Sequence, residues 1–187
     1  MGLLLLMAAV TATAQNVWKT DAVSVKASDK SVTVQLSLEN ADTITALQFD
    51  LVVPQGLTLD ANSASLSDAR KDGHTLSVEK QGDDNIYRFL VHHADNKALK
   101  EHNGTLISLP VTIGEGFKSG TFAMSNVVMT NKKAESLSYS TQFGLISLLT
   151  KQKVVLSVSG LEQRVNTEKP AVVSFTTTPA EVASEIT

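Results

Sequence analysis

The residues that could carry chemistry in this chain are four histidines and a few carboxylates. His92, His93 and Asp95 stand close together at the end of an alternating apolar and polar segment. Because adjacent residues of a strand point to opposite faces, His92 and His93 cannot both bind one metal ion without a local distortion. His74 and His102 lie next to expected turns, where exposed histidines are common. We therefore predict no metal site and no cofactor.

Residue types suited to catalysis are also poorly placed. Asp83 and Asp84 are adjacent carboxylates, but the sequence GDDN around them is typical of a turn. The absence of cysteine excludes thiolate nucleophiles, disulfides and Cys-based zinc sites. No serine stands in a nucleophile elbow, and no glycine-rich loop precedes a helix. We expect a protein that is not an enzyme.

The net charge of the chain bears on its possible partners, and its N-terminal apolar run bears on its location in the cell. The 187 residues include 16 Lys and Arg against 19 Asp and Glu, so the net charge of -3 gives no general attraction for nucleic acid. The apolar run from Leu3 to Val10, followed by Ala12-Thr13-Ala14, is typical of a signal peptide cleaved after Ala14. The run is too short for a transmembrane segment, which takes about 20 apolar residues. We expect export to the outside or surface of a bacterial cell, because an exported eukaryotic domain of this size usually contains disulfides.

The polar residues of this chain must be positioned by strands, since the apolar pattern has a period of two. In SVTVQLSLEN, residues 31–40, every second residue is apolar. The next strand, within ITALQFDLVVP, has Leu47, Phe49, Leu51 and Val53 on one side and Ala46, Gln48, Asp50 and Val52 on the other. Pro54 removes a ladder donor and Gly56 favours a turn, so this strand ends there.

A hairpin is predicted for DGHTLSVEKQGDDNIYRFLVHH, residues 72–93, because turn clusters flank two alternating runs. Tyr87, Phe89 and Val91 are expected to face inward, since the opposite register would bury Arg88. Further alternating runs follow, and residues 61–70 could hold at most a short helical turn. The prediction is an all-β fold of two antiparallel sheets packed as a β-sandwich.

The segment SVTVQLSLENADTITALQFDLVVPQGLTL resembles the cohesin family, the non-catalytic receptor modules of bacterial surface and cellulosome proteins. The resemblance continues through YRFLVHHADN and NGTLISLPVTI and covers residues 20–148. It implies a nine-stranded jelly-roll, related in architecture to carbohydrate-binding modules, and a calcium-binding dockerin module as partner. Cellulosomal cohesins usually carry Asn and Asp outward on the strand matching 44–53, where this chain has Ala46 and Gln48. Val52-Val53-Pro54 stands where their strand usually ends in Tyr-Asp-Pro.

The C-terminal segment LSVSGLEQRVNTEKPAVVSFTTTPAEV is similar to the opening of bacterial Ig-like repeats of the MBG type. Such repeats occur as stalks of large surface proteins, which implies further domains beyond Thr187. The expected organisation is a signal peptide at 1–14, a cohesin-like sandwich at 15–150, and a linker with an incomplete Ig-like repeat at 151–187.

Three functions remain open at this point. The first is a binding or assembly module that engages a protein ligand, dockerin-like or other, through one sheet face, with Gln48, Asp50, Arg88 and His92 as the candidate binding residues. The second is a carbohydrate-binding module for a polysaccharide, which would need exposed aromatic residues, such as Trp18. The third is a structural spacer without a ligand.

Overall fold

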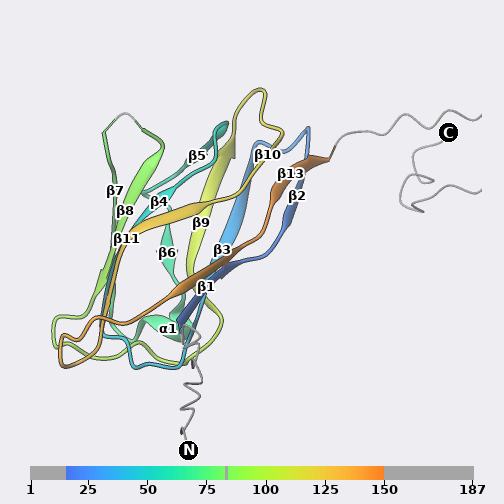
Figure 1. Ribbon diagram of the computed structural model, residues 1–187. Coiled ribbons are helices and arrows are strands. Elements are labelled where there is room, and N and C mark those ends of the chain that lie inside the picture. The colour runs from blue at the N-terminus through green and yellow to red at the C-terminus, as the bar shows by residue number, and fades with distance from the viewer. Residues whose placement is uncertain (1–15, 83, 150–187) are drawn as a thin grey trace, which may run out of the picture. The chain divides into compact units, whose positions relative to one another are not determined.

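The computed structural model describes residues 16–82 and 84–149, and these residues form a β-sandwich (Figure 1). Strands account for nearly all of the regular structure, and the short helix α1, Asp68–Lys71, overlaps the end of the segment 61–70, where a helical turn is expected from the sequence. The all-β, two-sheet prediction is confirmed. The predicted signal peptide, linker and Ig-like repeat lie outside the described residues.

Two main sheets form the layers of the sandwich, which Figure 1 shows as two groups of arrows. The smaller of the two, called here the β4–β8 sheet, has the order β11-β4-β8-β7. Its strands are β11 (Ala123–Thr130), β4 (Ala46–Val52), β8 (Ile86–His92) and β7 (Thr75–Lys80). The other, called the β3–β9 sheet, has the order β12-β1-β3-β9-β5, with β6 also paired to β9. Its strands are β12 (Ser140–Phe143), β1 (Asn16–Thr20), β3 (Ser31–Asn40), β9 (Thr105–Ile113), β5 (Leu57–Leu59) and β6 (Ser65–Leu66).

A third, small sheet continues the first and last strands of the domain past a bend. It contains β10 (Ser119–Gly120), β13 (Ile146–Leu149) and β2 (Val23–Lys26). Taking β1 with β2 and β12 with β13 as two bent strands, and leaving out the two-residue β6 and β10, gives the nine strands expected for the jelly-roll. The pairs β1/β12 and β2/β13 are parallel, whereas the other strand pairs in the described residues are antiparallel. The ends of the domain therefore lie side by side and close the sandwich.

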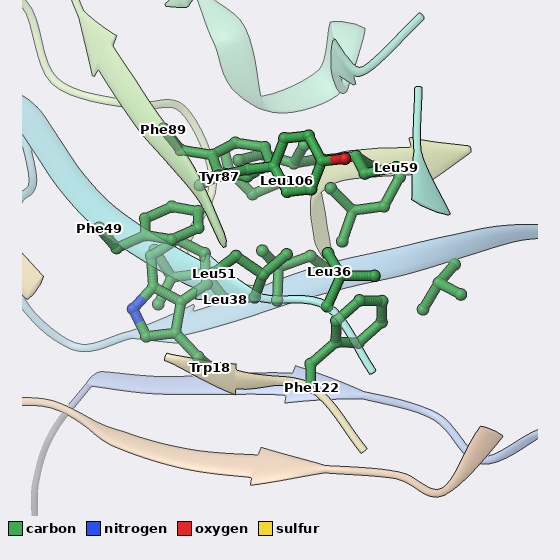
Figure 2. Packing of buried hydrophobic residues seen from close by; sticks show 14 of the residues in the cluster. Trp18, Leu36, Leu38, Phe49, Leu51, Leu59, Tyr87, Phe89, Leu106 and Phe122 are labelled. Atoms are coloured by element: carbon green, nitrogen blue, oxygen red, sulfur yellow. The ribbon is translucent and has the colours of Figure 1, made fainter. Parts of the chain in front are cut away.

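The core is built from the inward residues that the alternation predicts. Phe49 of β4 is fully buried, stacks on Phe89 of β8 at a centroid distance of 4.8 Å, and packs against Trp18 of β1 at 5.0 Å (Figure 2). Since β1 belongs to the opposite sheet, this aromatic group joins the two layers. Tyr87 and Val91 are also buried, so the predicted register of the β7/β8 hairpin is confirmed.

The strand β4 stops at the sequence PQG because the chain there fits tightly against another loop. Gly56 has a φ of 85°, and its carbonyl accepts a hydrogen bond from the amide of Gly114 at 2.7 Å. A Cβ on Gly120 would lie 2.4 Å from the Cβ of Pro54. The turn is therefore a structural junction at one end of the sandwich, and the outward residues of β4 precede it.

At the other end, Arg70 of α1 is buried although it is charged. Its guanidinium donates to the carbonyl oxygens of Leu38, Lys100 and Gly104 at 2.7, 2.9 and 3.1 Å, and to Oδ1 of Asn40 at 2.6 Å. Burial lowers the pKa of Arg70, but an arginine remains charged at any ordinary pH. This side chain holds α1, the end of β3 and the loop before β9 together.

We expect Arg70→Met to reduce the free energy of unfolding by about 3 kcal/mol, because it leaves buried acceptors without donors. Lys71→Met is the matched control in the same helix, since the side chain of Lys71 is exposed and forms a surface ion pair with Asp68, and it should cost much less than Arg70→Met. Urea unfolding of both variants measures the difference. Equal stability of the two variants would show that the buried guanidinium does not hold this end together.

We expect Gly144→Ala to destabilise the fold at the bend between β12 and β13. An added Cβ would lie 2.3 Å from the amide nitrogen of Ala22, so the two parallel strand pairs would have to separate. Overpacking of this kind costs about 1–3 kcal/mol. Thermal unfolding should show a lower midpoint for Gly144→Ala than for Leu145→Ala, a change at the neighbouring, half-exposed residue. An unfolding midpoint equal to that of Leu145→Ala would contradict the close approach of Gly144 to the backbone of Ala22.

Candidate functional site

The outer face of the β4–β8 sheet presents rows of side chains that run across the strands. A charged row contains Glu79, Arg88, Asp50 and Ser125, and the row beside it contains Ser77, Leu90, Gln48 and Val128. On the other side of the charged row lie Ile86, Val52 and Ala123, and at the far end lie Thr75, His92, Ala46 and Thr130. Rows in a sheet are about 7 Å apart along the strands. We call this surface the β4–β8 face.

The centre of the β4–β8 face is an ion pair between Asp50 of β4 and Arg88 of β8. Nε and Nη2 of Arg88 donate to the two carboxylate oxygens of Asp50 at 2.7 and 2.8 Å. Asn126 of β11 donates from Nδ2 to Oδ2 of Asp50 at 2.7 Å. The Asp50 side chain is 6% exposed and that of Arg88 is 41% exposed. The carboxylate therefore lies beneath the guanidinium, on the outer side of the sheet.

These hydrogen bonds stabilise both charges. The hydrogen bond from Arg88, assisted by that from Asn126, lowers the pKa of Asp50, against the opposing effect of burial. Asp50 in turn raises the pKa of Arg88. A two-point contact between arginine and a carboxylate fixes the guanidinium plane, so Arg88 is held in one orientation.

Asn126 reaches Asp50 because β11 is irregular at this point. The register between β11 and β4 shifts between Ser125 and Val128, and Asn126 has a φ of 50°. Asparagine adopts this left-handed conformation more readily than most residues, and a bulge re-aims the side chains of its strand. The bulge thus turns the Asn126 amide toward the Asp50 carboxylate.

Apolar side chains flank the ion pair on both sides. Leu90 is 38% exposed and Val128 is 48% exposed, and both are direct cross-strand neighbours of Gln48. Val52 and Ile86, on the other side of the charged row, are half-buried. An arginine surrounded by apolar residues is a common arrangement at the centre of protein interfaces.

The four candidate binding residues from the sequence lie on this one face. Gln48, Asp50, Arg88 and His92 all point outward, and Arg88 is the direct neighbour of Asp50. His92 is exposed at the edge, beside Thr75. Asp50 differs from expectation in being buried, so Arg88 offers the accessible surface of the pair. That these residues bind a ligand stays a prediction.

The histidines and acidic residues of the described part of the chain do not assemble into a metal site. Within residues 16–82 and 84–149, no group of three or more His, Asp or Glu side chains is placed to hold a metal ion. His74 is buried, contrary to the expectation of an exposed residue, and its two ring nitrogens face the carbonyl oxygens of Lys71 and Thr45. His102 is exposed, with Nδ1 against the carbonyl oxygen of Asn40.

An aromatic platform for sugar rings is also missing from the part of the chain that the structure describes. Trp18 is fully buried in the core, and Tyr87 is buried as well. Tyr139, which is 37% exposed, is the large aromatic residue with the most exposed side chain among those described. In the same residues, no helix is long and apolar enough to cross a membrane.

Comparison with solved structures identifies the fold. No protein-family model matches the chain, and no curated protein matches it in sequence. A cohesin in a cohesin–dockerin complex from Clostridium thermocellum is similar with a TM-score of 0.61 at 15% identity, covering 76% of this chain and 98% of that one. A non-cellulosomal cohesin from the archaeon Archaeoglobus fulgidus has a TM-score of 0.60 at 13% identity, with coverages of 74% and 94%.

The seventh ScaB type I cohesin from Pseudobacteroides cellulosolvens has a TM-score of 0.59 at 13% identity, covering 78% of this chain and 99% of that one. Each of these modules is matched over nearly its whole length. At such low identities the likeness establishes the fold alone, so the sandwich has the cohesin jelly-roll fold and its function must be argued from its own surface.

The Asp50–Arg88 pair should make stability depend on pH. Because the pKa of Asp50 is lowered in the folded state, the pair contributes in full above the unfolded carboxyl pKa of about 4 and is lost as the pH falls through the folded value. We expect a double-mutant cycle with Asp50→Asn and Arg88→Gln to give a favourable coupling at pH 6 that becomes smaller as the pH is lowered below about 4 and Asp50 takes up a proton. Urea unfolding across this range measures it. A coupling that is constant with pH would rule out an ionised Asp50 as its source.

Proposed function

We propose that this chain is a non-catalytic binding module that engages a dockerin-type protein through the β4–β8 face. The observation that carries the proposal is Arg88, fixed by a buried carboxylate and flanked by exposed Leu90 and Val128. Several of the similar solved structures are described as complexes of a cohesin with a dockerin, which supports this class of partner. Fold likeness alone does not establish it.

The outer face of the β3–β9 sheet has a different character and serves as the contrast. Its outward residues are almost entirely small and polar, and the charged pair among them, Lys19 and Glu39, forms an exposed ion pair. The exposed residues of this face include Ser31, Thr33, Gln35, Thr58, Ser65 and Thr112. No large exposed apolar side chain lies on these strands at the outward positions, so this face lacks the anchors that interfaces need.

The wider setting that we propose is an exported bacterial protein in which the module is displayed at the cell surface, followed by Ig-like segments. It is supported by the sequence of residues 1–14, which is typical of a signal peptide, and by the similarity of residues 156–182 to Ig-like repeats. In that setting the module would attach its polypeptide to another protein. The dockerin partner would bring calcium, because the family's dockerins are calcium-binding.

The proposal is tested by calorimetric titration of the full chain with a panel of dockerin modules in the presence of calcium. The panel includes the dockerins of the similar solved complexes, Doc435 and Doc918 from Clostridium thermocellum and the Cel5 dockerin of the Acetivibrio cellulolyticus complex. We expect measurable binding to at least one of them. Leu90→Asp should weaken this binding at least a hundredfold, roughly 2.7 kcal/mol, because it places a charge in the same row as the exposed apolar side chain of Val128. Gln48→Ala should weaken it about fivefold.

The matched control is Thr33→Asp, which places the same charge on the outer face of the β3–β9 sheet and should leave binding unchanged. If Thr33→Asp abolishes binding and Leu90→Asp does not, the partner binds the outer face of the β3–β9 sheet, and the proposed face is wrong. Absence of binding to every dockerin in the panel would contradict a dockerin-type partner.

A further inference from the structure

The hydrogen-bonding capacity that remains on the Asp50–Arg88 pair consists mainly of donors. An arginine has five N–H donors and no acceptor, and Arg88 uses one on Nε and one on Nη2 to bind Asp50. The two donors of Nη1 and the second donor of Nη2 have no partner among the described residues. Since Arg88 is 41% exposed, this edge of the guanidinium is open to a ligand.

The Asp50 carboxylate, in contrast, offers little to a partner. Its two oxygens together accept three hydrogen bonds, from Arg88 and Asn126, and the side chain is 6% exposed. A partner hydroxyl or amine would therefore find no accessible carboxylate at the centre of this face. Asp50, a candidate binding residue from the sequence, therefore contributes by orienting Arg88, and the group offered to a partner is a donor.

The charge around Arg88 argues against a partner carboxylate. Asp50 already neutralises the guanidinium, and Glu79 is the cross-strand neighbour of Arg88 on β7. A further carboxylate on this row would be repelled by two negative charges and attracted by one positive charge. Backbone carbonyls carry only partial charge, and the last turn of a helix presents up to four of them without partners.

We propose that Arg88 binds the free carbonyl oxygens at the C-terminal end of a partner helix, whose last apolar residues pack on Leu90 and Val128. A helix is about 10 Å wide, which is enough to cover the charged row and the neighbouring row with Leu90. Asn126 is the positioning residue, because it holds the Asp50 carboxylate that orients the guanidinium. The proposal rests on the function proposed above and specifies the chemistry of the partner.

The test uses a yeast-display library of two-helix miniproteins in which one helix face and its C-terminal turn are randomised. The library is selected on the full chain and counter-selected on Leu90→Asp, so that the retained binders use the β4–β8 face. We expect Arg88→Met to weaken these binders at least tenfold and Asn126→Gly about threefold. The glycine variant keeps the left-handed backbone accessible and removes only the amide. Thr33→Ala, on the other sheet, is the control and should have no effect.

A second arm distinguishes carbonyls from carboxylates. We expect the selected last turns to lack Asp and Glu, and Glu introduced there should weaken binding at least fivefold. Binders that require an acidic side chain, or that keep full affinity for Arg88→Met, would overturn the inference. Dockerin binding that depends on Leu90 but not on Arg88 would leave the proposed function intact and remove this inference. If no Leu90-dependent binder emerges, the face is not a docking surface, and both proposals fail.

Discussion

The packing of Phe49 between Trp18 and Phe89 is the interaction on which the rest of the molecule depends. Phe49 lies on β4, Phe89 on its neighbour β8, and Trp18 on the opposite sheet, so one buried side chain determines both the register of a strand pair and the contact between layers. Because side chains alternate along a strand, burying Phe49 forces Gln48 and Asp50 outward. A slip by one residue would expose the aromatic core and bury the ion pair. Core packing therefore determines which residues form the β4–β8 face.

The cost of placing Asp50 on this face explains why three strands cooperate there. A carboxylate that is almost fully covered is unfavourable unless it is paired and hydrogen-bonded. Arg88 from β8 supplies the charge and Asn126 from β11 supplies a further donor, so both neighbours of β4 are needed. Removing either partner would leave a buried charge with too few donors. Because Arg88 pairs with this carboxylate, its exposed guanidinium is held in one orientation. A partner that binds a side chain already held in place loses less side-chain entropy on binding.

Much of the fold could be predicted from the sequence because alternation is a local signal. The inward residues of β4 and β8 and the outward position of Arg88 all followed from period two, and Pro54 and Gly56 indicated the end of β4. The parallel pairing of the terminal strands could not be predicted in this way, since it joins residues more than a hundred positions apart. The buried positions of Arg70 and His74 also depend on distant carbonyl groups, such as those of Leu38 and Thr45, that no local pattern indicates.

The candidate site was predictable only in part for the same reason. Gln48, Asp50, Arg88 and His92 were identified from the outward positions of two strands, but Asn126 was missed because it comes from a third strand that is distant in sequence. A signal was present: in AMSNVVMT the inward residues Met124, Val127 and Met129 break strict alternation, which indicates a bulge at Asn126. The bulge adds to the effect of Arg88 on the chemistry of the face, because Arg88 and Asn126 together occupy the Asp50 carboxylate, which then supports a donor and is no longer an acceptor available to a ligand. Two sandwiches with the same buried pattern can thus present opposite hydrogen-bonding character, which is why a shared fold leaves the partner to be decided by the outward residues.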